Sequence, residues 1–107
     1  MEELSIELLQ KLCKSNAILW TAHALRRLQE RNIYREDILN VINNGKIIEQ
    51  YPDSYPNPAC LVLGVSLKNE YLHIVVGCNG ECMSIITAYF PTTDKFDSDF
   101  EVRKEKE

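Results

Sequence analysis

Three β-rich segments in the second half of the chain most constrain how it folds. They are ACLVLGVSL at 59–67, EYLHIVVGC at 70–78 and CMSIITAYF at 82–90, separated only by KN and NGE. Connections this short join antiparallel strands, because a parallel crossover needs a dozen residues or more. The segments therefore predict an antiparallel meander. KIIEQY at 46–51 predicts a fourth strand, which the proline-rich loop PDSYPNP separates from the others.

The first half of the chain predicts helices. Leucines recur at helical spacing over residues 3–14, which is typical of an amphipathic helix. A second helix begins at Thr21, whose hydroxyl suits an N-cap, and ends near Asn32. A third runs from Glu36 to Asn44, where Asn-Gly closes it. The expected fold class is α+β, with two to three N-terminal helices packed on one face of a four-stranded antiparallel sheet.

The chain has 107 residues, which is the length of one domain. We expect a single domain over residues 1–91. The segment 92–107 is expected to be an appended charged tail, with six acidic and four basic side chains from Asp94 onward. No stretch has the roughly 18 consecutive apolar residues that span a bilayer, and the first residues do not resemble a signal peptide. We expect a cytoplasmic protein with no membrane association.

The register of the last turn decides which side chains share a face of the sheet. A two-residue Asn-Gly loop would pair His73 with Ile86 and mix polar and apolar residues on both faces. A three-residue NGE loop pairs His73 with Thr87. It also pairs Tyr71 with Tyr89. We favour this second register because it places the apolar side chains together on one face, against which the helices can pack. That face would consist of Leu72, Ile74, Val76, Ile86 and Ala88.

The four cysteines are expected to be reduced thiols in a cytoplasmic protein. In the favoured register Cys78 faces Cys82 across the turn, an arrangement compatible with a cross-strand disulfide or with half of a metal site. A structural zinc ion needs four ligands, usually from two such pairs. Cys13 and Cys60 are isolated, so we expect no metal. We expect no other cofactor either, because the sequence has no Gly-rich phosphate loop or dinucleotide fingerprint.

A basic stripe stands out in a chain whose net charge is −4 and whose pI is about 5.2. His23, Arg26 and Arg27 fall on the polar side of the second predicted helix, and Arg31 lies at its margin. Glu30 can pair with the arginines and weaken their field. Overall acidity argues against binding nucleic acid through the whole surface. A local phosphate-binding edge and a docking face for an acidic partner segment both remain open.

The residue types on the sheet and on the basic helix suit metal-independent RNA cleavage. Cleavage by attack of the 2′-hydroxyl needs a base, an acid and cations around the phosphate, with aromatic rings to stack bases. His73, with Tyr71, Thr87 and Tyr89 on the same predicted face, supplies such groups beside the basic helix. The same residues also suit a solvated helix and hydrogen bonds within the sheet.

Several of these segments resemble a known family. TAHALRRLQERNIYREDILNVINNGKIIEQYP, LVLGVSLKNEYLHIVVG and IITAYFP are similar to the bacterial family numbered 4258 among domains of unknown function. Its pattern runs HA…R…R.I…DI…G…Y, LHVV and ITVYxP, and the likeness covers roughly residues 18–91. The resemblance implies a small α+β fold similar to the BrnT and RelE toxins, which are ribosome-dependent or free ribonucleases neutralised by an antitoxin partner.

The resemblance singles out residues without giving them an established role: His23, Arg27, Arg31, Tyr51, His73, Thr87 and Tyr89. The low pI departs from RelE-like toxins, which are strongly basic. Two hypotheses follow. The first is a toxin-type, metal-independent endoribonuclease acting on RNA or the ribosome. The second is a non-enzymatic protein-interaction domain that docks a partner through its basic helix or sheet edge.

In the first hypothesis the expected catalytic residues are His73, Tyr89 and His23. The expected substrate-binding residues are Arg27, Arg31, Tyr71, Thr87 and Tyr51. In the second hypothesis Arg27 and Arg31 contact the partner protein.

Overall fold

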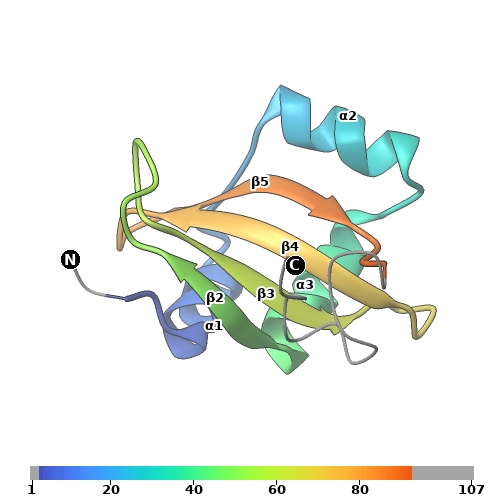
Figure 1. Cartoon of the computed structure of the whole chain (residues 1–107), viewed down its shortest axis with the longest axis horizontal. Coiled ribbons are helices and arrows are strands. Elements are labelled where there is room, and N and C mark those ends of the chain that lie inside the picture. The colour runs from blue at the N-terminus through green and yellow to red at the C-terminus, as the bar shows by residue number, and fades with distance from the viewer. Residues whose placement is uncertain (1–2, 93–107) are drawn as a thin grey trace, which may run out of the picture.

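The computed structural model describes residues 3–92, in which three helices pack on one side of a five-stranded sheet (Figure 1). The predicted α+β class is confirmed, and the predicted tail falls outside the described residues except for its first residue. Among the described helices none is long and apolar enough to cross a bilayer. In chain order the elements are α1 (Ile6–Lys14), β1 (Ile18–Trp20), α2 (Ala22–Glu30), α3 (Arg35–Asn44), β2 (Lys46–Tyr51), β3 (Ala59–Val65), β4 (Tyr71–Cys78) and β5 (Met83–Tyr89).

The prediction of four antiparallel strands is wrong, because the sheet has a fifth strand and is mixed. Its order is β1-β5-β4-β3-β2. β1 pairs in parallel with β5, from Ile18 opposite Met83 to Trp20 opposite Ile85. A strand of three residues is too short to show a period-two pattern in the sequence. Its pairing with β5 and the packing of Ile18 and Trp20 against the core stabilise it.

All three helices share one hydrophobic core with the same face of the sheet, which we call the inner face. Leu9 of α1, Leu28 of α2 and Ile38 of α3 are buried in that core. The inner-face residues are Cys60, Val62, Leu72, Ile74, Val76, Cys78, Met83, Ile85 and Ala88. The opposite face of β2 to β5, which we call the outer face, carries residues that alternate with these.

Local signals explain where the helices begin and end. The side chains of Ser5 and Thr21 accept hydrogen bonds from the backbone N–H groups of Leu8 and Ala24, at 3.1 and 3.0 Å. Each cap satisfies an N–H that the first helical turn leaves unpaired. Asn32 follows α2 with a φ of 58°, a left-handed conformation that asparagine tolerates better than most residues. The predicted start and end of the second helix are therefore confirmed.

Two β-bulges set the register of the sheet and correct the predicted pairing. The β4–β5 turn is one residue longer than predicted, and the register shifts by one more residue at Ile86, so His73 pairs with Tyr89 rather than with Thr87. Cys78 pairs with Met83 and does not face Cys82. Ile86 lies outside the core and is 40% exposed, contrary to the predicted apolar face. The second bulge lies at Ile48 in β2. A bulge adds one unpaired residue, which a uniform alternation cannot anticipate.

A single buried carboxylate joins α3 to the far end of the β3–β4 hairpin. One oxygen of Asp37 accepts a hydrogen bond from the backbone N–H of Tyr34 at 2.9 Å. The other accepts from the backbone N–H of Leu67, also at 2.9 Å. Asp37 is only 6% exposed. The first contact caps the start of α3, and the second fixes the hairpin turn against that start.

Replacing Asp37 with asparagine should destabilise the protein by about 1–3 kcal/mol, because the amide keeps one acceptor and turns an N–H toward a buried N–H donor. Glu36→Gln is the matched control, since Glu36 lies in the same helical turn and is exposed. It should change the free energy of unfolding by less than about 0.5 kcal/mol. Urea denaturation measures both. Equal stability of the two variants would show that the carboxylate does not join the two elements.

Candidate functional site

The outer face of the sheet gathers most of the predicted site residues. His73 pairs with Tyr89 in β5 and with Leu63 in β3. Thr87 lies two residues before Tyr89, and Tyr71 lies two residues before His73. Side chains two apart on a strand share a face. Tyr51 also belongs to this face, because it pairs with Ala59, which alternates with the inner-face residues of β3.

His73 and Tyr89 form a close pair of titratable side chains on this face. Nδ1 of His73 lies 3.4 Å from the hydroxyl oxygen of Tyr89. The two rings meet edge to face, with their centroids 5.4 Å apart. An imidazole can take up a proton near neutral pH, and a phenol can give one up. The arrangement therefore places an acid and a base side by side.

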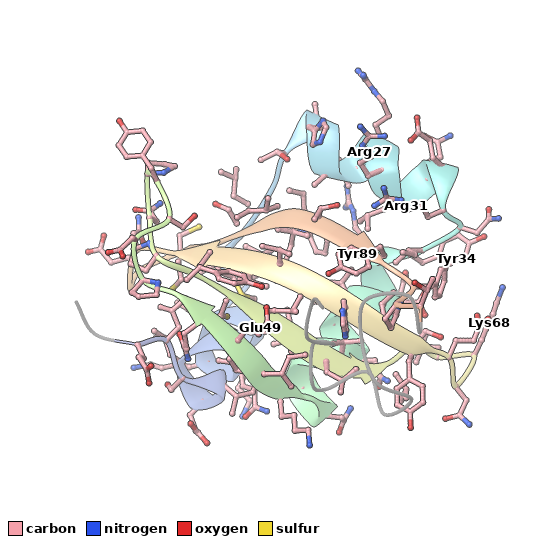
Figure 2. All side chains as sticks on the ribbon, in the orientation of Figure 1. Arg27, Arg31, Tyr34, Glu49, Lys68 and Tyr89 are labelled. Atoms are coloured by element: carbon pink, nitrogen blue, oxygen red, sulfur yellow. The ribbon has the colours of Figure 1, made fainter. Side chains whose placement is uncertain are left out.

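Arg31 reaches the same strand from the end of α2. β1 pairs with β5 only as far as Ile85, so within residues 3–92 no strand lies beside this edge of β5 beyond that residue. Nη1 of Arg31 donates to the carbonyl oxygen of Ala88 at 2.7 Å and to Oγ1 of Thr87 at 3.3 Å. Both contacts use one terminal nitrogen, which leaves the guanidinium further donors toward an anion. Figure 2 shows Arg31 near the end of β5 and Tyr89.

His23 and Arg27 do not join this group. His23 is exposed in the first turn of α2. Arg27 forms an ion pair with Glu30 at 3.3 Å, and the two side chains are 44% and 53% exposed. Figure 2 shows Arg27 on α2, farther from the sheet than Arg31. The basic stripe is therefore divided, because only Arg31 contacts the strand that carries Tyr89.

Glu49 is an outer-face residue that the sequence did not single out. It pairs with Leu61, and its carboxylate accepts a hydrogen bond from the hydroxyl of Tyr51. The bulge at Ile48 turns both side chains to the outer face. The sequence could have indicated this pair, because Glu49 and Tyr51 are two residues apart in a predicted strand and side chains at that spacing share a face.

In the part of the chain that the structure describes, the cysteines and the remaining acidic groups form no second centre. All four cysteines are free thiols. Burial raises the pKa of the Cys60 thiol to about 12, and the nearby Cys78 adds to the rise. Cys60 therefore stays protonated at neutral pH and is a poor nucleophile. Within residues 3–92 no three His, Cys, Asp or Glu side chains gather in a way that could hold a metal ion.

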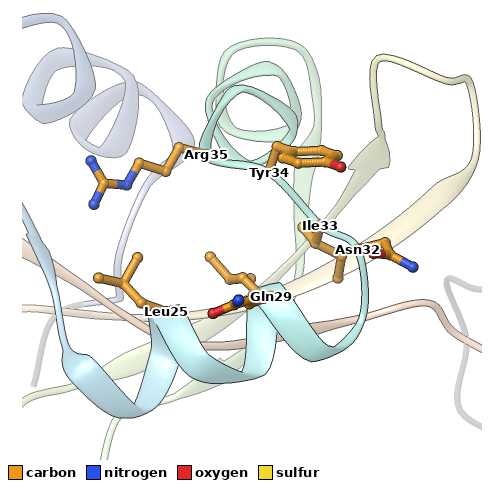
Figure 3. Close-up of a pocket in the computed structure, with 7 residues that line it drawn as sticks. Leu25, Gln29, Asn32, Ile33, Tyr34 and Arg35 are labelled. Carbon is orange, nitrogen blue, oxygen red and sulfur yellow. The ribbon is translucent and has the colours of Figure 1, made fainter.

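A cavity of about 250 Å³ lies between α2 and the start of α3 (Figure 3). Leu25 and Gln29 line it from α2, and Tyr34 and Arg35 line it from the opposite side. The guanidinium of Arg35 lies 5.4 Å from the ring centroid of Trp20, within the range of a cation–π contact. The cavity is largely apolar with one cation at its edge.

Replacing Arg31 with methionine should destabilise the protein by about 1–2 kcal/mol, because the Ala88 carbonyl at the open edge of β5 loses its donor. Arg26→Met is the control, since Arg26 is an exposed arginine of the same helix. It should change stability by less than about 0.5 kcal/mol. Thermal unfolding followed by circular dichroism compares the two. If Arg31→Met is as stable as Arg26→Met, the contact with β5 does not hold α2 in place.

Comparison with known proteins gives the family but no characterised relative. A search of curated proteins and a search of solved structures found no match to this chain. The family model described as a domain of unknown function, DUF4258, matches residues 20–90. The match begins at the last residue of β1, continues through β5 and includes all the outer-face residues described above. The chain therefore belongs to the DUF4258 family.

Proposed function

We propose that the protein is a metal-independent endoribonuclease of the toxin type, whose reaction centre is the outer face around His73 and Tyr89. The observation that carries the proposal is the 3.4 Å approach of the His73 imidazole to the Tyr89 hydroxyl. Arg31 donates hydrogen bonds to Thr87 and Ala88, the two residues that precede Tyr89 in β5. A base, an acid and a cation within one patch are the groups that phosphodiester cleavage requires.

The proposed reaction is attack of a ribose 2′-hydroxyl on the adjacent phosphorus. His73 accepts the 2′-hydroxyl proton, and Tyr89 donates a proton to the departing 5′-oxygen. The oxygen–phosphorus bond to the leaving group breaks as the new bond forms, giving a 2′,3′-cyclic phosphate and a free 5′-hydroxyl. Arg31 stabilises the charge that builds on the phosphate oxygens. Tyr71, 48% exposed at the start of β4, stacks on a neighbouring base.

Two predicted residues take peripheral roles in this proposal. Arg27 is held by Glu30, so it attracts the RNA backbone rather than the scissile phosphate. His23 is exposed at the start of the same helix and belongs to the same approach surface. The fold relation to BrnT and RelE, and an antitoxin partner, stay predictions that accompany the toxin assignment.

Tyr89→Phe tests the proposed acid, because it removes one hydroxyl and keeps the ring. Cleavage of a mixed-sequence RNA, measured in chelator with and without ribosomes, should fall at least about 100-fold. Tyr55→Phe is the control, since Tyr55 is 93% exposed in the loop after β2, and it should cleave like the wild type. Equal rates for the wild type and Tyr89→Phe would remove Tyr89 from catalysis. RNA binding without cleavage would reduce the protein to a binding module.

The cavity between α2 and α3 favours protein interaction as a second candidate function. Tyr34 at its rim is 57% exposed, and Arg35 adds a positive charge. An aliphatic side chain followed by an acidic one would suit this surface.

Gln29→Trp should block the cavity mouth from an exposed position without disturbing the core. Binding to the co-expressed product of the neighbouring reading frame should weaken at least about tenfold, a loss of about 1.4 kcal/mol. Arg26→Trp adds the same bulk elsewhere on α2 and should leave that affinity unchanged. Calorimetry of purified proteins measures both. A complex that tolerates Gln29→Trp does not use the cavity.

A further inference from the structure

The cavity between α2 and the start of α3 has the lining of a site for a small flat ligand. Leu25, Leu28 and Ile33 form its apolar part, and the last two are buried in the core. Figure 3 shows Gln29 on one side of the cavity and the ring of Tyr34 on the opposite side. Pockets for drug-sized ligands occupy roughly 300–1,000 Å³. A cavity of about 250 Å³ therefore suits one flat ring system rather than a larger molecule.

Hydrogen bonds hold both walls of the cavity in place. The backbone N–H of Ile33 donates to the carbonyl oxygen of Leu28 at 2.9 Å, which fixes the turn that follows α2. The backbone N–H of Tyr34 donates to the buried carboxylate of Asp37, also at 2.9 Å. A site whose walls are already fixed loses little conformational freedom when a ligand binds.

We infer that this cavity binds an adenine base of single-stranded RNA. Tyr34 is 57% exposed and offers a ring on which an unstacked base can lie. Gln29 and Asn32 are exposed at the cavity, and each amide supplies donors and an acceptor. Adenine presents a donor at N6 beside an acceptor at N7, which one such amide matches with two hydrogen bonds. A base thus uses the ring and the amides, whereas an aliphatic protein side chain uses only the apolar part of the lining.

Two cations beside the cavity suit the phosphates on either side of such a base. Nζ of Lys68 lies 5.9 Å from the ring centroid of Tyr34, and Arg35 lines the cavity itself. Neither forms an ion pair within residues 3–92, where the ion pair joins Arg27 to Glu30. Lysine and arginine contacts to phosphate supply much of the affinity for nucleic acid. The charges therefore favour an RNA strand as the ligand.

Arg31 connects the cavity to the proposed reaction centre. Its side chain donates to Thr87 and Ala88 of β5, and the next residue, Asn32, lines the cavity. An RNA strand whose scissile phosphate lies at Arg31 has the cavity beside it. A base held there selects the position of cleavage. That selecting role rests on the proposed function, but binding of the base does not.

Binding of an RNA that cannot be cleaved tests the base site apart from catalysis. A 2′-O-methyl hexa-adenylate lacks the attacking hydroxyl, and fluorescence anisotropy in chelator measures its affinity for the full chain. Tyr34→Ala should weaken this binding at least about fivefold, because the stacking ring is lost. Tyr55→Ala is the matched control, since it removes an exposed tyrosine from the loop after β2. It should bind like the wild type.

The identity of the base is tested with a 2′-O-methyl hexa-uridylate, which the wild type should bind at least about fivefold more weakly than the adenylate. Gln29→Ala changes an exposed side chain and should reduce this preference, because one matching amide is lost. Circular dichroism establishes that each variant is folded, and Tyr34→Leu replaces Tyr34→Ala if that one unfolds.

Four results would overturn the inference. The wild type and folded Tyr34→Ala could bind the adenylate equally, or the wild type could bind both oligonucleotides equally. Adenosine monophosphate could bind as tightly as the hexamer, which would make the ligand a free nucleotide. A leucine–aspartate peptide could bind through Tyr34 while neither oligonucleotide binds, which would assign the cavity to a protein partner. Because the hexamers cannot be cleaved, failure of the nuclease proposal leaves this test intact.

Discussion

The candidate site exists because of two β-bulges. In β5 Met83 and Ile85 point into the core, and strict alternation would send Thr87 and Tyr89 there as well. The extra residue at Ile86 reverses the alternation, so Ala88 takes the core position and the two polar side chains turn outward. The bulge in β2 does the same for Glu49 and Tyr51, which follow the inward-facing Ile47. Each bulge therefore reverses which residues face the core, so that polar side chains beyond it lie on the outer face.

Arg31 connects this outer face to the helical layer. β1 is too short to pair with all of β5, and the guanidinium donates to the edge that remains. The same group is the nearest cation to Thr87 among the described contacts. A residue that supports the fold and lies beside the proposed reaction centre is held in one orientation, which suits the proposed phosphate contact. Its structural role also means that Arg31 is a poor choice for a charge-reversal test of partner binding.

Most elements could be predicted from the sequence because their patterns are local. The caps at Ser5 and Thr21, the left-handed Asn32 and the strand KIIEQY each depend on neighbouring residues. The grouping of His73, Thr87 and Tyr89 on one face was also predicted, although through a wrong register. β1 and the two bulges depend on pairing between distant segments, and no local pattern encodes them.

The pairing of β4 with β5 decides whether the acid and base groups meet, so cross-strand backbone nuclear Overhauser effects on the full chain are the most direct measurement. The bulged register predicts that His73 lies opposite Tyr89 and that Cys78 lies opposite Met83. Effects that keep Cys78 opposite Met83 but pair His73 with Ala88 would show a uniform strand without the bulge, and effects that pair His73 with Thr87 and Cys78 with Cys82 would show a shorter turn as well. Tyr89 would then no longer be the direct partner of His73, and the proposed reaction centre would lose its basis.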